Sequence, residues 1–279
     1  MKSEVEQKCC TDGDTMEANE YLIDYYSNND EDGRLTSKSG SVEFLTTLRY
    51  VEKYLKPGDR IMEIGAATGR YSHAFARRGY TVDAVELIEH NIKLFKENTQ
   101  PDEKVTITQG NAVDLSAFAD DTYDIVLLLG PMYHLYTKSD KQKALSEAIR
   151  VAKREGVIFV AYCISDATIM CSGFELKHFD MFKFLEDGLI DPETFATHSE
   201  PKDIIELVRK EDIDELMHDF AITRLHYVAA NGVTHFIGEA IDNMDEAMFE
   251  LYLKYHHSIC ERPDMLGMTH HALDIFRKV

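Results

Sequence analysis

The chain has 279 residues, of which 44% are hydrophobic, so it can bury a core the size of one large domain. Its formal net charge of −20 repels phosphate backbones and anionic lipids, which argues against nucleic acid as the routine substrate and against a membrane as a partner. No apolar run approaches the length that spans a bilayer, and residues 1–19 are polar and acidic with no signal-peptide pattern, so we expect a cytoplasmic protein.

Residues 1–40 are expected to form an N-terminal cap or lid. Residues 21–26 predict a short helix, and an acidic, loop-like stretch separates them from Arg34. Tyr26 and Arg34 are candidate cofactor ligands, because an aromatic ring can face a cation and a guanidinium can pair with a carboxylate. The alternative is a helix that docks only through aromatic packing.

Residues 41–163 show strands and helices in alternation after a first helix that Ser41 could cap and that runs to about Leu55. Strands are predicted over 60–65, 81–86, 104–108, 123–129 and 156–162, and helices over 69–79, 88–98 and 139–153. The strands are apolar almost throughout, which is typical of a sheet covered on both faces. This order predicts an α/β fold with a Rossmann-like, doubly wound, mostly parallel sheet.

The alternation breaks after Cys163. Residues 164–221 are predicted to be a helical insertion, with a helix over about 202–218, and the aromatic-rich part at 164–200 is expected to be a substrate lid. A helical hairpin that only thickens the core is the alternative. Strands near 222–228 and 271–276, with a helix over about 243–260, would complete the sheet within residues 222–279.

A glycine turn between the first strand and its helix is the strongest functional signal. It reads Glu63-x-Gly65-x-Ala67-x-Gly69, and such turns let a ligand approach bare main chain. Glu86 ends the next strand, where a carboxylate can accept hydrogen bonds from both hydroxyls of a ribose. Together these features predict an adenosine-containing cofactor at the carboxyl edge of the sheet.

The spacing of the turn separates two cofactors. The dinucleotide pattern Gly-x-Gly-x-x-Gly would place glycines where the chain has Ala67 and Arg70, so a nicotinamide-dependent oxidoreductase is the poorer fit. The pattern acidic-x-Gly-x-Gly-x-Gly has one small mismatch, at Ala67. Here the chain resembles the class I S-adenosylmethionine (SAM)-dependent methyltransferases, from about residue 42 to 163 and more weakly from about 223 onward. A non-catalytic protein with a degenerate adenosine-cofactor pocket stays open as a third interpretation.

The resemblance implies roles for particular residues and an antiparallel last strand. The turn would hold the methionine part of SAM, Glu86 the ribose, the Asn111 side chain and the Ala112 amide the adenine, and the loop after the fourth strand the methionine amino group. The implied cofactor residues are Glu63, Gly65, Ala66, Ala67, Gly69, Glu86, Leu87, Asn111, Ala112, Leu129 and Gly130. A plain turn capped by Asn111 is the alternative for that residue.

The loop Gly130-Pro131-Met132-Tyr133-His134-Leu135 should lie where the methyl group is transferred. It lacks the Asn/Asp-Pro-Pro-Tyr of some amino-methylating relatives and resembles small-molecule methyltransferases with a Gly-Pro-x-Tyr-His-Leu loop. His134 is the candidate general base, or else fixes the loop, and Tyr133 lines the transfer channel or packs. Pro131, Tyr133, His178 and Arg224 are the candidate acceptor contacts. In-line methyl transfer can also run on alignment alone, without a strong base.

Metal chemistry is not expected. The five cysteines show no Cys-x-x-Cys spacing, which favours reduced thiols, and His256, His257 and Cys260 read more simply as incidental residues on one helix turn. The expected partner is a small-molecule methyl acceptor. The sequence leaves open whether the acceptor atom is oxygen, nitrogen, sulfur or carbon, and whether the chain forms a homodimer.

Overall fold

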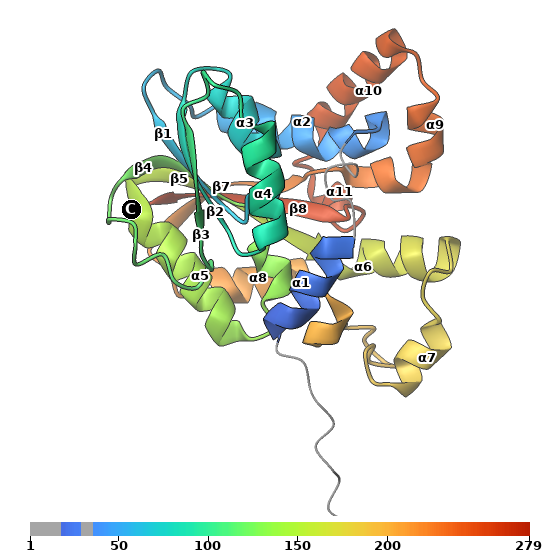
Figure 1. The fold of residues 1–279 in the computed structure, drawn as a ribbon. Coiled ribbons are helices and arrows are strands. Elements are labelled where there is room, and N and C mark those ends of the chain that lie inside the picture. Colours follow the sequence, from blue (N-terminus) through green and yellow to red (C-terminus); the bar gives the residue numbers. More distant parts are fainter. Residues whose placement is uncertain (1–17, 29–35) are drawn as a thin grey trace, which may run out of the picture.

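The computed structural model describes residues 18–28 and 36–279, and its centre is a mixed sheet (Figure 1). The strand order is β3-β2-β1-β4-β5-β8-β7, with β6 paired to β5. The strands are β1 (Arg60–Ile64), β2 (Thr81–Glu86), β3 (Val105–Gln109), β4 (Tyr123–Leu128), β5 (Ala152–Ile164), β6 (Leu207–Val208), β7 (Ile222–Ala229) and β8 (His271–Lys278). Only β8 runs against its neighbours among these strands. The predicted fold class, including the antiparallel last strand, is confirmed.

Helices cover both faces of the sheet. The longer ones are α1 (Ala18–Asn28), α2 (Lys38–Glu52), α3 (Arg70–Ala76), α4 (Glu89–Asn98), α5 (Lys138–Val151), α8 (Lys210–Met217) and α10 (Glu246–Ile259). The shorter ones are η2 (Pro131–His134), α6 (Ser165–Thr168), η3 (Ile169–Glu175), α7 (Met181–Glu186), η4 (Pro201–Asp203), η5 (Gly232–Ile237), α9 (Gly238–Asp242) and α11 (Pro263–Leu266). No helix among the described residues is both long enough and apolar enough to cross a bilayer.

Alternate residues of the central strands enter two separate cores. Val126 and Leu128 of β4 pack with the buried residues of α5 and α8, while Ile125 and Leu127 pack with those of α2 and α3. Successive strand side chains point to opposite faces, so a strand must be apolar at every position to serve both cores. The need to serve both cores explains why the predicted strands are apolar at nearly every position in the sequence.

The order in which the chain adds strands to the sheet reverses between β1 and β4. From β1 the chain proceeds to β2 and β3 on one side, and β4 and β5 extend the sheet on the other. In open α/β sheets, ligands bind in the crevice at the carboxyl ends of the strands where the order reverses. The loops after Ile64 and Leu128 border that crevice, and α1 lies against α4 and η4 beside it (Figure 1).

Two helix predictions were wrong. Ser37, and not Ser41, caps α2, and its Oγ accepts a hydrogen bond from the Gly40 amide at 3.0 Å. The predicted helix over 202–218 is split into η4, β6 and α8. Residues 207–208 pair with the end of β5, and Ile204 takes a positive φ of 66°, so strand pairing overrides the local helical pattern.

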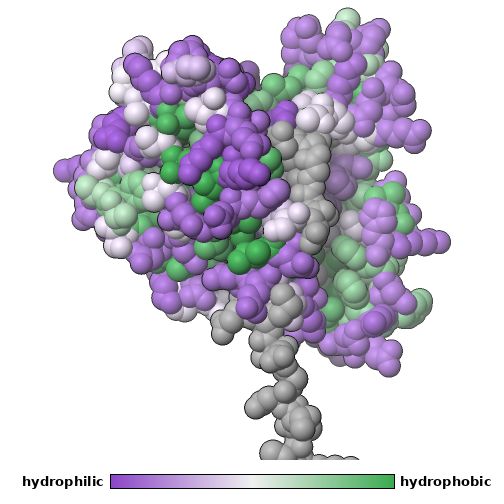
Figure 2. All heavy atoms as spheres, in the orientation of Figure 1, coloured by the Kyte–Doolittle hydropathy of each residue, from purple (hydrophilic) through white to green (hydrophobic). Residues whose placement is uncertain are grey.

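The insertion between β5 and α8 exposes several large apolar side chains, including Phe174 and Phe182. Figure 2 shows hydrophilic residues over most of this face, with hydrophobic residues between them both over the central part and over the α6–α7 region. Whether residues 164–200 move as a lid stays a prediction.

Candidate cofactor and acceptor site

The glycine turn after β1 takes a left-handed backbone at Gly65 (φ +77°), Ala67 (φ +45°) and Gly69 (φ +91°). A Cβ atom on Gly65 would lie 2.5 Å from Pro131 Cδ, and one on Gly69 would lie 2.5 Å from a ring carbon of Phe95. Glycine is therefore required at both positions on two grounds, backbone conformation and space. Ala67, the mismatch to the family pattern, adopts the same region although it carries a Cβ.

Glu86 is hydrogen-bonded directly to this turn. One of its carboxylate oxygens accepts from the Ala67 amide at 2.8 Å, and the other accepts from the Ile88 amide at 2.9 Å and from Asn91 Nδ2 at 3.4 Å. Its side chain is buried, which raises the pKa of the carboxyl group. The structure thus brings together the turn and the carboxylate that the sequence placed at one edge of the sheet.

Glu63, unlike Glu86, is hydrogen-bonded to the start of α3. Its carboxylate accepts hydrogen bonds from the Ser72 amide, at 2.8 Å, and from the Ser72 hydroxyl, and this contact fixes the start of α3 against β1. Burial raises the pKa of Glu63 to about 8. Glu63 lies on the wall of the crevice but already has a structural role there.

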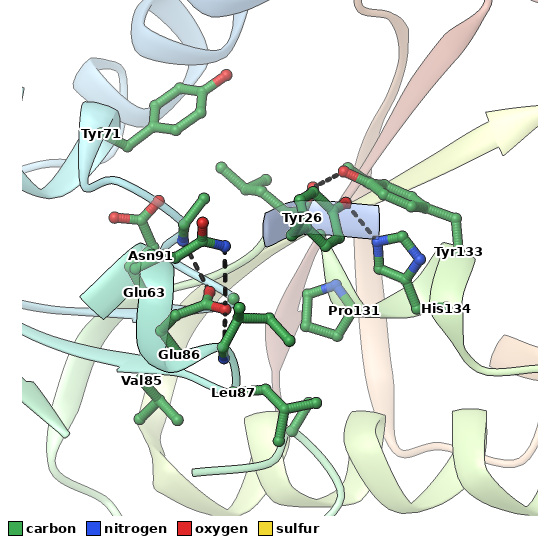
Figure 3. A pocket seen from close by; sticks show the side chains of 18 of the residues that line it. Tyr26, Glu63, Tyr71, Val85, Glu86, Leu87, Asn91, Pro131, Tyr133 and His134 are labelled. Atoms are coloured by element: carbon green, nitrogen blue, oxygen red, sulfur yellow. Dashed lines mark hydrogen bonds between the residues drawn. The ribbon is translucent and has the colours of Figure 1, made fainter. Parts of the chain in front are cut away.

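A cavity of about 160 Å³, the cofactor cavity, opens between the glycine turn, Glu86 and the loop after β4 (Figure 3). The predicted cofactor residues on its wall are Tyr26, Glu63, Gly65, Ala66, Ala67, Glu86, Leu87, Asn111, Ala112, Leu129 and Gly130. Gly69 shapes the turn without reaching the wall, and Arg34 lies outside the described residues. Asn19, Glu43, Thr47, Tyr71, Asn91 and His271 also line the cavity, and the sequence analysis did not find them.

Asn111 lies on the wall, yet its side-chain oxygen accepts a hydrogen bond from the Val113 amide at 3.2 Å. This is the local cap that the sequence offered as the alternative. The adenine contact stays a prediction for Asn111 and for Ala112, whose amide lies in the same turn.

His134 makes two hydrogen bonds that limit its chemistry. Its Nδ1 lies 2.8 Å from the Ile204 carbonyl oxygen and must carry the proton, because a carbonyl only accepts. Its Nε2 therefore accepts from the Tyr26 hydroxyl at 2.8 Å (Figure 3). Burial lowers the pKa of His134 to about 4, so the ring is neutral near pH 7. His134 itself lines the cavity, but both of its ring nitrogens are hydrogen-bonded within the protein, so the structure favours the loop-fixing alternative over a base that takes a proton from the acceptor.

Two of the four predicted acceptor contacts, Arg224 and His178, are not supported by their positions in the structure. Arg224 lies near the start of β7, far from the carboxyl edge, where its guanidinium binds the buried Asp274 at 2.8 and 3.0 Å and also Asp214. His178 is exposed and lines neither cavity of the described structure. Both errors arise because position in the chain does not reveal which end of a strand, or which side of an insertion, meets the crevice.

A second, larger cavity of about 770 Å³, the acceptor cavity, adjoins the first. The insertion supplies apolar wall residues such as Phe179, Phe184 and Ile190, and polar residues come both from the insertion and from α2, η5 and β8. Four residues line both cavities: Tyr26, Glu43, Tyr133 and His271. The Tyr133 hydroxyl donates to the Leu129 carbonyl at 2.9 Å, which holds its ring at the junction. The two cavities are therefore neighbouring chambers with a common wall.

Known proteins resemble this chain in sequence and in fold. A family model described as a methyltransferase domain matches residues 62–160. The glycine/sarcosine N-methyltransferase of Aphanothece halophytica is 26% identical over 164 residues, 57% of this chain and 60% of that protein. A Methanocaldococcus jannaschii protein, provisionally named a ribosomal RNA large subunit methyltransferase, is 31% identical over 150 residues, 46% of this chain and 38% of its own length. A solved structure from Pyrococcus horikoshii OT3 has a TM-score of 0.61 at 15% identity, covering 92% of this chain and 99% of that one.

The sheet order, the glycine turn and the acidic residue after the second strand define a Rossmann-like protein with a site for an adenosine cofactor. The match of residues 62–160 to the methyltransferase domain supports a class I SAM-dependent methyltransferase, and the Pyrococcus structure shares the fold. It spans 60% and 38% of the lengths of the two curated relatives, which do not share one kind of acceptor.

Proposed function

We propose that the protein transfers a methyl group from SAM to a small molecule. The single observation that carries this proposal is the pair of adjoining cavities, one bordered by the glycine turn and Glu86 and the other closed by the insertion. Two substrates that react by in-line displacement need such neighbouring sites, because most of the catalysis is proximity and alignment.

The residues around the first cavity fit SAM. The crevice between Gly65 and Glu86 is open, and the turn presents main chain without side-chain bulk. Glu86 would hold the ribose, residues 110–112 the adenine, and Gly65 with the 129–131 loop the methionine part. When bound, SAM supplies an electrophilic methyl group on a positively charged sulfur. The chain's own contribution is to orient that group toward the second cavity and to exclude water.

Two observations favour a small acceptor over nucleic acid. The second cavity is lined by Phe179, Phe184 and other insertion residues, and a concave site with apolar side chains and some polar groups suits a small molecule. The net charge of −20 opposes binding of a phosphate backbone. One relative is provisionally named a ribosomal RNA enzyme, so a methylation assay with RNA is a necessary control.

Calorimetry with SAM and with its demethylated product, S-adenosylhomocysteine (SAH), tests the cofactor assignment. The Glu86→Ala variant should bind both more weakly by about 1–3 kcal/mol, roughly 5- to 150-fold, because a buried hydrogen-bond partner is lost. Glu97→Ala, an exposed change on α4, is the matched control and should bind as the wild type does. Unfolding curves of both variants would show whether the protein keeps its stability when Glu86 is replaced.

Two results would reject the proposal. Absence of binding to both SAM and SAH would remove the cofactor, and a change in NADH fluorescence on mixing would favour the nicotinamide oxidoreductase instead. Binding of SAM with no methyl transfer to any member of a broad acceptor panel would favour a non-catalytic cofactor-binding protein.

A further inference from the structure

We propose that the methyl acceptor has an apolar ring as its body, and that Phe179 and Phe184 of the insertion bind this ring and select for it. This inference rests on the proposed function and deepens it, by naming a class of acceptor and the residues that distinguish it from smaller polar molecules. The starting observation is the pair of rings itself. Their centroids lie 5.2 Å apart with an interplanar angle of 21°, and both rings line the acceptor cavity but not the cofactor cavity.

The two rings belong to an apolar wall that the insertion builds along one part of the acceptor cavity. Phe179 and Phe184 are each only half-buried, although both are large apolar side chains. Apolar area that stays accessible on a cavity wall is area that an apolar ligand can remove from water. The aliphatic side chains of the same wall are Ile169, Leu189, Ile190, Ile204, Ile205 and Leu207.

The local backbone holds both rings in place. Asp180, which lies between them, caps α7, and its carboxylate accepts hydrogen bonds from two amides of the first turn, each at 3.1 Å. The Phe179 amide donates to the Ser172 carbonyl at 3.3 Å, and the Leu189 amide donates to the Phe184 carbonyl at 2.9 Å. The ring pair is therefore a surface that the main chain fixes on both sides of the α7 N-cap.

A short segment of the insertion fixes this wall to the loop after β4. The Ile204 carbonyl accepts hydrogen bonds from His134 Nδ1 at 2.8 Å and from the Tyr136 hydroxyl at 2.7 Å. The Glu206 amide donates to the Tyr133 carbonyl at 2.7 Å. Ile204 is β-branched and has a φ of +66°, a strained conformation that persists only where the surroundings determine it. These contacts hold the strain and set the wall's position relative to the loop.

The size and the chemistry of the acceptor cavity favour a ringed acceptor over a small polar one. The volume of about 770 Å³ lies within the range of about 300–1,000 Å³ that is usual for drug-sized ligands. An acceptor of a few atoms would leave water against the apolar wall, which is unfavourable. Aromatic rings attract one another in offset-stacked or edge-to-face arrangements, so Phe179 and Phe184 offer a ring contacts that an alkyl chain does not use.

An elongated acceptor can reach both ends of the cavity at once. Its reacting atom must face the methyl group at the wall that the two cavities share, where Tyr26 and Tyr133 lie. Its ring would then lie against Phe179 and Phe184, which line the acceptor cavity alone. A body held against a fixed wall limits the directions from which the reacting atom approaches, and in-line displacement depends on that alignment.

A tryptophan introduced at the wall can report on the ring, because the chain contains no tryptophan. Phe184→Trp places this reporter on the wall. Phe182→Trp is the matched control, since Phe182 lies on the same helix, is 86% exposed and lines neither cavity. We expect phenethyl alcohol or phenethylamine to change the tryptophan emission of Phe184→Trp and not that of Phe182→Trp. No change in Phe184→Trp, or the same change in both variants, would overturn the proposal.

Two series of ligands test the ring in calorimetry with the wild-type SAH complex. Phenethyl alcohol, 1-pentanol and ethanol share a hydroxyl group, and phenethylamine, pentylamine and ethylamine share an amino group. The pentyl compounds have about the hydrophobicity of the ringed ones but contain no ring. In at least one series, the ringed member should bind at least tenfold more tightly than the two-carbon member and more tightly than the pentyl member. Any other ranking in both series would overturn the proposal.

Variants of Phe184 test the residue itself. Phe184→Ala should weaken binding of the ringed ligand by about tenfold or more, because the aromatic contact and the buried area are both lost. Phe184→Leu keeps an apolar side chain and should lose the preference for the ring over the pentyl chain. Phe182→Ala should keep the wild-type affinities. A wild-type ring preference in both Phe184 variants would overturn the assignment.

Binding of SAM and SAH is measured separately on the same proteins. It should be unchanged in the Phe184 variants, because Phe184 does not line the cofactor cavity. If Phe184→Ala also loses SAH binding, the milder Phe184→Leu decides the test. If the wild-type protein binds neither SAM nor SAH, the proposed cofactor is rejected, and the ring preference of the cofactor-free protein still decides this inference.

Discussion

Gly65 and Pro131 meet across the carboxyl edge of the sheet, so closely that a Cβ atom on Gly65 would lie 2.5 Å from Pro131 Cδ. The first residue follows β1 and the second begins η2 after β4, so the glycine turn and the loop after β4 are in direct contact at the point where the strand order reverses. Both residues line the cofactor cavity, so a change at either should affect that cavity.

Gly65→Ala should lose about 2–4 kcal/mol of unfolding free energy, from the left-handed backbone and from overpacking against a rigid ring. Cofactor affinity should fall at least tenfold as the Pro131 loop is displaced. Gly79→Ala is a close control, because Gly79 has a similar φ of +90° with nothing within 4 Å of its added Cβ. It should lose only about 1–2 kcal/mol and bind SAH normally. Equal losses in the two variants, measured by urea unfolding, would show that the contact with Pro131 is unimportant.

Ala67→Gly should keep or raise stability, by up to about 1.5 kcal/mol, although Ala→Gly usually destabilises. Ala67 has φ +45°, so glycine relieves about 1–2 kcal/mol of backbone strain against about 0.5–1 kcal/mol of added chain entropy. Its amide can still donate to Glu86. Ala247→Gly, on the exposed face of α10, should lose about 0.5–1 kcal/mol. If Ala67→Gly loses as much as Ala247→Gly in urea unfolding, the turn at Ala67 is not strained.

The features that could be predicted from sequence are those fixed by short-range patterns. The glycine turn and Glu86 are separated by one helix and one strand, so parallel pairing of β1 with β2 brings them together. The mostly parallel sheet followed from the alternation of strands and helices. The spacing of residues along the chain was sufficient for both predictions.

The features that were missed depend on contacts between distant segments. His134 has an ordinary sequence context, but its partners Tyr26 and Ile204 are 108 and 70 residues away, and they occupy both of its nitrogens. Glu43 of α2 and His271 of β8 are also far apart in sequence, yet a Glu43 carboxylate oxygen lies 3.2 Å from His271 Nδ1. A single sequence carries no local signal for such pairs, so the chemistry at the junction could not be predicted from it.

The buried Glu63 should make stability fall as pH rises. Its pKa is raised from 4.5 to about 8 in the folded protein, so between these values the folded state holds a proton that the unfolded state has released. The contribution is complete below pH 4.5 and is lost as pH rises toward 8, with a slope of at most about 1.4 kcal/mol per pH unit. Glu63→Gln should flatten the pH dependence of urea unfolding between pH 5.5 and 8, whereas Glu97→Gln should leave it unchanged. Equal slopes in all three proteins would mean that Glu63 is ionised in the fold.

The Tyr26–His134 hydrogen bond joins α1 to the loop after β4, and it should control how long the cofactor stays bound. Tyr26→Phe removes the donor, and His134→Asn removes the acceptor while keeping a side-chain N–H that can reach the Ile204 carbonyl. Each change should weaken SAH binding by about 0.5–1.5 kcal/mol, mainly through faster dissociation in stopped-flow measurements.

The double variant distinguishes a shared bond from two separate roles. If the bond is the only contribution of both side chains, Tyr26→Phe with His134→Asn should lose no more affinity than either single change, so the coupling energy equals the single loss. Tyr21→Phe, on the same helix but on neither cavity wall, should bind SAH as the wild type does. Additive losses would show that Tyr26 and His134 act independently, and α1 would then contribute to cofactor binding by packing and not by this hydrogen bond.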